Sequence, residues 1–160
     1  KPSVSILLPA NREARETTSL YGGVGIGQSL AYDLNKSGVP LKATLGTFVR
    51  RNIHEYTSTN EGSSNTQYMF TNFLRGDLQI SEKISFITKG TVYSGLTYSD
   101  SWRSKFEIFE EIGYQINDTF AVALGHVNTE STLKSDMTSS NVEFFNNNTS
   151  SIYVDLNVAY

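Results

Sequence analysis

The sequence predicts an all-β protein, an eight-stranded antiparallel up-and-down β-barrel that crosses a membrane with its strands. Hydrophobic residues alternate with small or polar residues along eight segments, which is the period of a β-strand with two different faces. Short turns alternate with longer polar loops between these segments, as they do in transmembrane barrels. Aromatic residues are plentiful, with nine Tyr and nine Phe, whereas only 18% of the residues are charged.

The segments follow one another along the whole chain, and we expect residues 1–160 to form a single barrel domain. The first segment is the weakest, because Val4, Ile6 and Leu8 alternate but Pro9 predicts a short or frayed strand. The last segment is "IYVDLNVAY". Its alternate residues, from Ile152 to the aromatic Tyr160, are hydrophobic and share one side of the expected strand, here called the apolar parity. The expected strands are residues 3–10, 19–35, 41–54, 68–80, 84–98, 105–116, 119–130 and 152–160.

The connections differ in length from one side of the expected sheet to the other. Residues 35–40, 81–83 and 117–118 form short turns. The longer polar stretches are residues 11–18, 57–67, 99–104 and 131–150. An even number of strands places both ends of the chain on the side of the short turns, and this supports counting the weak first segment as a strand.

Charged residues are concentrated at the alternate strand positions opposite the apolar ones, here called the polar parity. Five acids nearly balance four bases there. We expect them to form ion pairs in a narrow lumen, where an unpaired charge would be costly. Small residues share this parity, and aromatic residues near both ends of the apolar parity suggest interfacial girdles. The apolar parity is therefore expected to face lipid. The expected lumen charges are Asp33, Lys42, Arg50, Arg75, Asp77, Lys89, Glu107, Glu111 and Asp155.

As a pattern, the chain resembles the small outer-membrane β-barrels of the OmpA/OmpX type over nearly its whole length. Residues 152–160 are similar to the C-terminal signal that the barrel-assembly machinery recognises, although Tyr160 stands where Phe is commoner. The resemblance implies residence in the outer membrane of a Gram-negative bacterium, exposed at the cell surface. It also implies contact with outer-membrane lipid and lipopolysaccharide, and with the assembly machinery during insertion.

Glu110 does not fit the lipid-facing row in which it lies. It shares its parity with Ile108 and Ile112. An acidic side chain facing hydrocarbon is unfavourable. Glu110 is either a lateral contact with another protein or a protonation-sensitive site. Alternatively, it lies at another depth than its position suggests, or a β-bulge and local thinning of the bilayer accommodate it.

His126 is the candidate for a catalytic base, since histidine exchanges protons near neutral pH. The chain loosely resembles lipid A deacylases of the PagL type, which are eight-stranded barrels with His, Ser and Glu near this position. His126 matches their base, but Asn128 stands where that family has its nucleophilic serine. Ser131 lies nearby without a match, and Glu130 and Glu143 are both open as the acid.

The loop of residues 131–150 is polar but includes Phe144 and Phe145. It either binds a partner or a saccharide through these rings, or extends the strands beyond the membrane. The chain has no cysteine and a net charge of −3 without a basic stripe. We therefore expect no thiolate metal site, no cofactor and no nucleic-acid partner.

The expected function is that of a non-enzymatic structural or interaction protein. It would present polar extracellular loops and have a lumen closed by side chains, because eight strands leave an interior that side chains fill. A protein partner would bind through the lipid-facing surface or the loops. Three alternatives stay open: a lipid A deacylase-like hydrolase centred on His126, a narrow channel, and a soluble ligand-binding barrel with its apolar parity inside.

Overall fold

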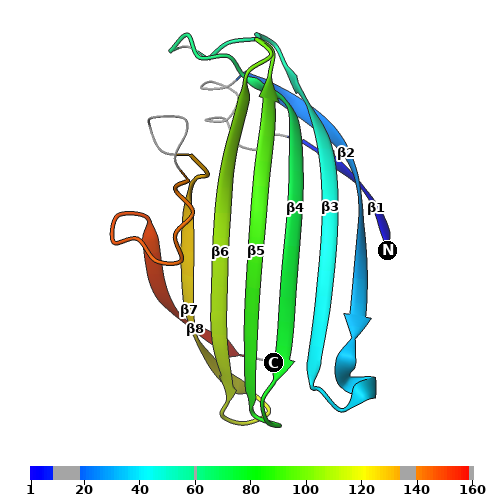
Figure 1. The fold of residues 1–160 in the computed structure, drawn as a ribbon, viewed down its shortest axis with the longest axis vertical. Coiled ribbons are helices and arrows are strands. Elements are labelled where there is room, and N and C mark those ends of the chain that lie inside the picture. Colours follow the sequence, from blue (N-terminus) through cyan, green and yellow to red (C-terminus); the bar gives the residue numbers. More distant parts are fainter. Residues whose placement is uncertain (9–18, 60, 134–139, 159–160) are drawn as a thin grey trace. The chain divides into compact units, whose positions relative to one another are not determined.

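The computed structural model describes residues 1–8, 19–59, 61–133 and 140–158 (Figure 1). Eight strands form one sheet with the order β1 to β8, each next to its neighbour in sequence. This confirms the predicted all-β, antiparallel, up-and-down architecture. None of the described helices has the length and apolar character needed to cross a membrane. The strands are β1 Pro2–Leu7, β2 Leu20–Asp33, β3 Leu41–His54, β4 Thr66–Gln79, β5 Ile84–Thr97, β6 Trp102–Gln115, β7 Phe120–Ser131 and β8 Ser150–Val158.

The strand boundaries agree with the predicted segments except at a few ends. β6 begins at Trp102, three residues before the predicted start, and β4 begins two residues early at Thr66. The predicted turn after β2 contains a short 3-10 helix, η1, over Leu34–Ser37. The Asp33 side chain accepts a hydrogen bond from the Asn35 amide, and Gly38 ends the helix in the left-handed region. The predicted end of the first strand at residues 9–10, and Tyr160, lie outside the described residues.

The chain divides into two compact units, which are described separately below. Unit 1 comprises Lys1–Ser29, Gly46–Asn72 and Tyr93–Ser104. Unit 2 comprises Leu30–Leu45, Phe73–Val92 and Lys105–Tyr160. The expectation of a single barrel domain stays a prediction.

Unit 1 holds β1 against β2, with a register that runs from Pro2 opposite Gln28 to Leu7 opposite Gly23. The glycines of β2 allow the next strand to approach closely. A Cβ added to Gly27 would lie only 2.7 Å from the carbonyl oxygen of Thr47, and one added to Gly25 would meet the ring of Phe48. These glycines therefore leave room for the Phe48 ring and the β3 backbone.

Unit 2 contains β7 and β8 complete, together with most of β6. Glu110 of β6 lies opposite His126 of β7, and His126 lies opposite Ile152 of β8. Two residues along, Asn128 of β7 lies opposite Ser150 of β8. Because side chains alternate across a strand, these five residues share one face of the three strands.

The opposite face of the same strands carries a row of Glu111, Gly125 and Tyr153. The Tyr153 hydroxyl donates a hydrogen bond of 2.8 Å to the Glu111 carboxylate, and its ring stacks on that of Phe109 with 6.5 Å between the ring centroids. A Cβ added to Gly125 would lie 2.1 Å from the Tyr153 ring carbon Cζ. The absence of a side chain at Gly125 thus leaves the space that the tyrosine ring occupies.

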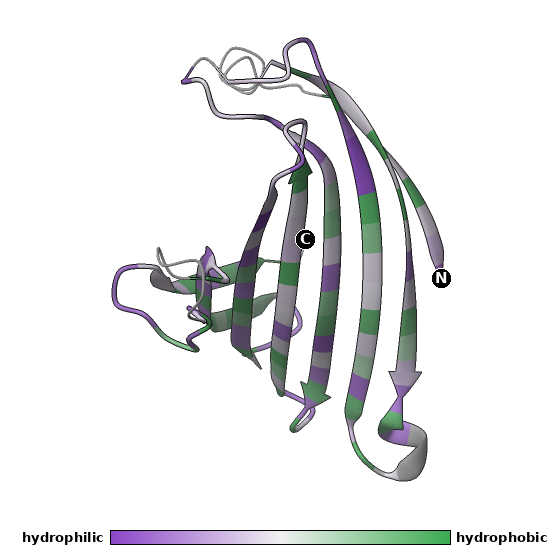
Figure 2. Cartoon of the chain, turned by 45° about the horizontal axis from the view of Figure 1, so that its top comes forward, coloured by the Kyte–Doolittle hydropathy of each residue, from purple (hydrophilic) through white to green (hydrophobic). Residues whose placement is uncertain are grey.

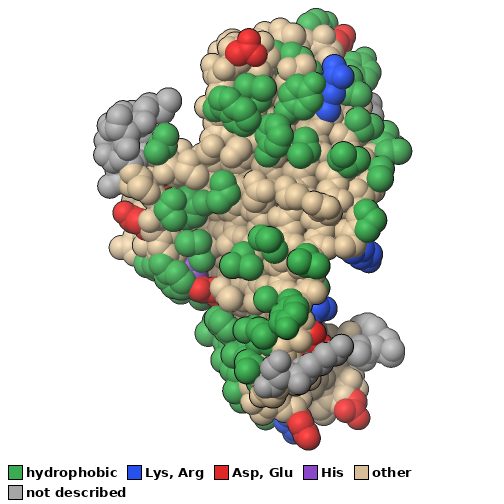
Figure 3. All heavy atoms as spheres, turned by 45° about the vertical axis from the view of Figure 1, so that its right-hand side comes forward, with side chains coloured by type: hydrophobic (Ala, Val, Ile, Leu, Met, Phe, Trp, Pro, Cys, Tyr) green, Lys and Arg blue, Asp and Glu red, His purple; other side chains and the backbone are tan. Residues whose placement is uncertain are grey.

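Hydrophobic and hydrophilic residues alternate along the strands, as the bands of Figure 2 show. The hydrophobic side chains of this alternation are largely exposed, and they are scattered over the face drawn in Figure 3. Among the described residues, the buried hydrophobic side chains are Phe106 and Ala123. The buried polar ones are more numerous: Asn52, Asn65, Thr91, Thr97 and Asn128. This burial is the reverse of that in a water-soluble protein, whose interior is mostly apolar.

Gly125→Ala is expected to destabilise the protein by about 1–3 kcal/mol, because the new methyl group overlaps the Tyr153 ring. The displaced ring would also lose its hydrogen bond to Glu111. The free energy of unfolding in detergent, from urea titration, measures the effect. Gly90→Ala is the matched control, since a Cβ at that strand glycine meets no atom within 4 Å. Equal stability of the two variants would contradict the packing role of Gly125.

Candidate functional site

Two of the separately predicted candidates, Glu110 and His126, are in contact. Glu110 on β6 and His126 on β7 are direct cross-strand partners. Their side chains meet with 3.4 Å between the carboxylate oxygen Oε2 and the ring nitrogen Nδ1. Glu110 therefore has a partner within its own chain, the neighbouring His126 on the same face. A lateral contact of Glu110 with another protein stays a prediction.

Ser150 completes the contacts of the histidine ring. It begins β8 opposite Asn128, one diagonal step from His126 on the same face. The Ser150 oxygen Oγ lies 3.2 Å from Nε2 of His126. The same oxygen accepts a hydrogen bond of 2.9 Å from the backbone amide of Asn146. The serine hydroxyl is therefore held in place from two sides.

The chemistry of the three groups assigns the protons. An ionised carboxylate only accepts hydrogen bonds, so the contact with Glu110 requires a proton on Nδ1 of His126. In a neutral imidazole the other nitrogen is then an acceptor. Ser150 consequently donates its hydroxyl proton towards Nε2. Acid, ring and hydroxyl form one chain of hydrogen bonds in the order Glu110, His126, Ser150.

Two aromatic rings of the loop before β8 border the histidine. The ring centroids of Phe144 and Phe145 each lie 5.6 Å from that of His126, both at tilted angles. The side chains of His126 and Glu110 keep only 15% and 20% of their exposure. Partial exclusion of water strengthens the electrostatic attraction between a carboxylate and an imidazole. The predicted role of the two phenylalanines in binding an external partner stays a prediction.

Asn128 anchors the loop that carries these rings. Its side chain is 0% exposed. Its amide Nδ2 donates 2.8 Å to the carbonyl oxygen of Glu143, and its Oδ1 accepts 2.6 Å from the Thr149 hydroxyl. The Glu130 carboxylate accepts further hydrogen bonds from the Asn146 side-chain amide and the Thr149 hydroxyl. Asn128, in the position of the nucleophile of PagL-type enzymes, is thus engaged in holding the loop.

Sequence reasoning missed Ser150, which it assigned to the end of a loop. The available signal was parity, since Ser150 belongs to the same row as Ile152 and Val154. The pairing of Asn128 with Ser150 depends on how the loop of residues 131–150 returns to β7, and the alternation pattern does not contain that information. The carboxylate in contact with His126 is that of Glu110 on β6, whereas Glu130 lies on β7 and Glu143 in the loop before β8.

The predicted lumen charges form separate contacts. In unit 2, Arg75 pairs with Asp77 at 2.5 Å and Lys89 with Glu107 at 3.7 Å. Asp155 accepts from Asn157 at 3.1 Å, and Lys42 lines a cavity of about 280 Å³ together with Asp33 and Asp77. In unit 1, the buried Nε of Arg50 has no hydrogen-bond partner among the described residues. Their role as a lumen network stays a prediction.

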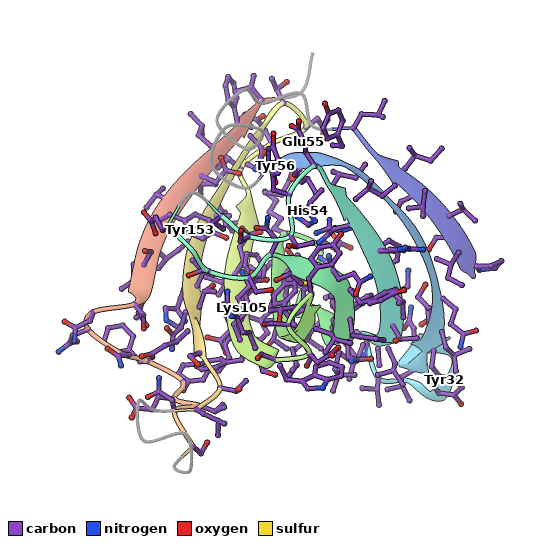
Figure 4. The ribbon with its side chains drawn as sticks, turned by 90° about the horizontal axis from the view of Figure 1, so that it is seen from above. Tyr32, His54, Glu55, Tyr56, Lys105 and Tyr153 are labelled. Atoms are coloured by element: carbon purple, nitrogen blue, oxygen red, sulfur yellow. The ribbon has the colours of Figure 1, made fainter. Side chains whose placement is uncertain are left out.

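The second histidine, His54, has different surroundings in unit 1. Its Nδ1 lies 3.4 Å from the Tyr98 hydroxyl, and the two rings meet edge to face at 5.6 Å. His54 ends β3 and is followed by Glu55 and Tyr56 (Figure 4). A hydrogen bond with Glu55 raises the pKa of the Tyr56 phenol above its ordinary value. The described side-chain contacts of His54 are with Tyr98, and they include neither a carboxylate nor a serine hydroxyl.

Neither histidine belongs to a cluster of potential metal ligands within the described ranges. In the part of the chain that the structure describes, no group of three or more potential ligands is placed to hold a metal ion. Comparison of the chain with protein-family models, curated proteins and solved structures gives no match. The resemblances drawn from the sequence therefore rest on the strand pattern, on residues 152–160 and on His126.

Asn128→Ala is expected to release the loop of residues 143–149 from β7. The change removes the hydrogen bonds of Asn128 to the Glu143 carbonyl and from the Thr149 hydroxyl, at a cost of about 1–3 kcal/mol in unfolding free energy. Hydrogen exchange of the loop amides, followed by mass spectrometry, should accelerate. Asn157→Ala serves as the control, because Asn157 is exposed and bonds only to Asp155 among its described contacts. Loop exchange that is unchanged in Asn128→Ala would argue against this anchor.

Proposed function

We propose that the chain is an eight-stranded transmembrane β-barrel of a Gram-negative outer membrane. Its role is structural or that of an interaction protein, with loops displayed at the cell surface and a lumen closed by side chains. The observation that carries the proposal is the exposed apolar row of the strands. On β8, the side chains of Ile152, Val154 and Leu156 are exposed by 67%, 71% and 62%.

The energetics of this row favour a lipid environment. Transferring one large aliphatic side chain out of water stabilises a protein by about 1.5–3 kcal/mol. The same pattern recurs on β2, where Val24, Ile26 and Leu30 are exposed. A row of such side chains in water would be an aggregation surface, whereas in a bilayer every one of them is solvated by hydrocarbon.

The lengths of the strands suit a membrane crossing. A tilted strand needs about 9–11 residues to span the hydrocarbon layer. Each strand from β2 to β6 has 14 residues, and β7 has 12. In lipid every backbone polar group needs a partner, so membrane residence requires the end strands of the order, β1 and β8, to pair and close the sheet.

The ion pairs on the polar face favour a lumen that is filled by side chains rather than an open channel. The Arg75–Asp77 and Lys89–Glu107 pairs neutralise four of the charges within unit 2. Eight strands leave an interior that side chains fill, so paired long side chains there leave no continuous water path. The proposed surroundings are outer-membrane lipid and lipopolysaccharide, with the barrel-assembly machinery as a partner during insertion.

Insertion into vesicles tests the proposal directly. The folded protein should float with lipid vesicles after an alkaline wash and migrate faster before boiling than after it. Recovery as a folded, detergent-free soluble protein would contradict the proposal and favour a water-soluble barrel.

Leu124→Arg should impair insertion, because an Arg on the lipid face near mid-depth costs about 2–4 kcal/mol. Val142→Arg is the matched control, since Val142 lies in the loop before β8 and is as exposed as Leu124, at 53% against 51%. The fraction of protein folded into vesicles is the measurement. Equal insertion of the two variants would show that the two exposed side chains meet the same solvent, and this would contradict a lipid-facing row.

A further inference from the structure

We propose that Ser150, His126 and Glu110 form a hydrolytic triad that cleaves ester-linked acyl chains of membrane lipids. Ser150 is the nucleophile, His126 the general base and Glu110 the acid that orients the ring. The inference goes beyond a structural role and rests on the proposed membrane residence for its substrate class.

The geometry has the order that nucleophilic catalysis requires. A hydroxyl becomes nucleophilic when a base accepts its proton, and the base is held by a third group. The distances of 3.2 Å from Ser150 to His126 and 3.4 Å from His126 to Glu110 place all three in contact. Such contacts are commonly looser before substrate binds than in the reacting complex.

The neighbouring surface indicates the substrate class. On the triad's face, Ile152 lies opposite His126, and the adjacent row consists of Ile112, Leu124 and Val154. All four side chains are exposed. An acyl chain of a bilayer lipid would contact this apolar row while its ester group reaches the Ser150 hydroxyl.

The proposed reaction uses only the triad, the ester and water. Ser150 Oγ forms a bond to the ester carbonyl carbon while its proton passes to Nε2 of His126. The bond from that carbon to the alcohol oxygen then breaks, and His126 returns the proton to the departing alcohol. Water, deprotonated by His126, attacks the acyl group on Ser150. The bond to Oγ breaks, the proton returns to Oγ, and a fatty acid is released.

Covalent labelling identifies the nucleophile. An alkyl fluorophosphonate bonds to an activated serine oxygen and loses fluoride. Folded wild-type protein in detergent should be labelled at Ser150, as mapped by peptide mass spectrometry, and Ser150→Ala should lose the label. Ser151→Ala is the matched control, because Ser151 is the adjacent exposed serine of β8 but lies on the opposite face from the triad, and this variant should keep the label. Labelling that persists in Ser150→Ala, or a folded wild-type protein that is not labelled, would overturn the proposal.

Turnover of a p-nitrophenyl acyl ester in detergent tests the base and the acid. His126→Ala should lower kcat/KM by at least about a hundredfold, as expected for loss of a general base. Glu110→Gln should lower it by at least about tenfold, since the ring loses its orienting carboxylate. His54→Ala and Glu111→Gln, each checked for heat-modifiable folding, are the matched controls and should keep the wild-type rate. Loss of turnover in the controls as well would contradict a specific triad.

Two vesicle compositions then separate the lipid sources. Phosphatidylethanolamine vesicles offer phospholipid esters, and the same vesicles with lipopolysaccharide add the acyl esters of its lipid part. Release of fatty acid from either supports the proposal and names the source. Turnover of the p-nitrophenyl ester without release from either would overturn the lipid substrate. Turnover in detergent by protein that fails to insert would count against the membrane proposal alone.

Discussion

The register of β7 against its two neighbours is the constraint on which the rest of the structure depends. Successive side chains of a strand point to opposite faces, so a slip of one residue would exchange the faces of β7. The observed register sets His126 beside Glu110 and near Ser150 on one face. It sets Gly125 under the Tyr153 ring on the other. One backbone pairing therefore places both the polar cluster and the packing of the opposite face.

The two faces solve different physical problems. One face carries exposed aliphatic rows, which hydrocarbon solvates better than water does. Glu110 and His126 lie in such a row, where a single unpaired charge would be costly. Their mutual contact and the hydroxyl of Ser150 beside His126 reduce that cost. A polar pair maintained on an apolar surface at such expense is typical of a functional site rather than of a stabilising one.

The strands were predictable because a period of two persists over each of them, as in residues 19–35. The polar cluster was predictable only in part. Parity placed Glu110 on the apolar face and chemistry singled out His126, but their pairing depends on register. Ser150 and the anchoring role of Asn128 depend on the return path of the loop. The helix η1 arises from Asp33 and Gly38 at its two ends, which are local capping signals outside the alternation.

The central claim is that the apolar row of β8 faces lipid. The chain contains no cysteine, so nitroxide labels can be attached at single positions. Labels on Ile152→Cys, Val154→Cys and Leu156→Cys in vesicles should be accessible to lipid-soluble oxygen and shielded from a water-soluble nickel reagent. Labels on Tyr153→Cys and Asp155→Cys should be less accessible to oxygen than the labels at positions 152, 154 and 156. An inverted alternation, or access of the nickel reagent to all five positions, would contradict the account.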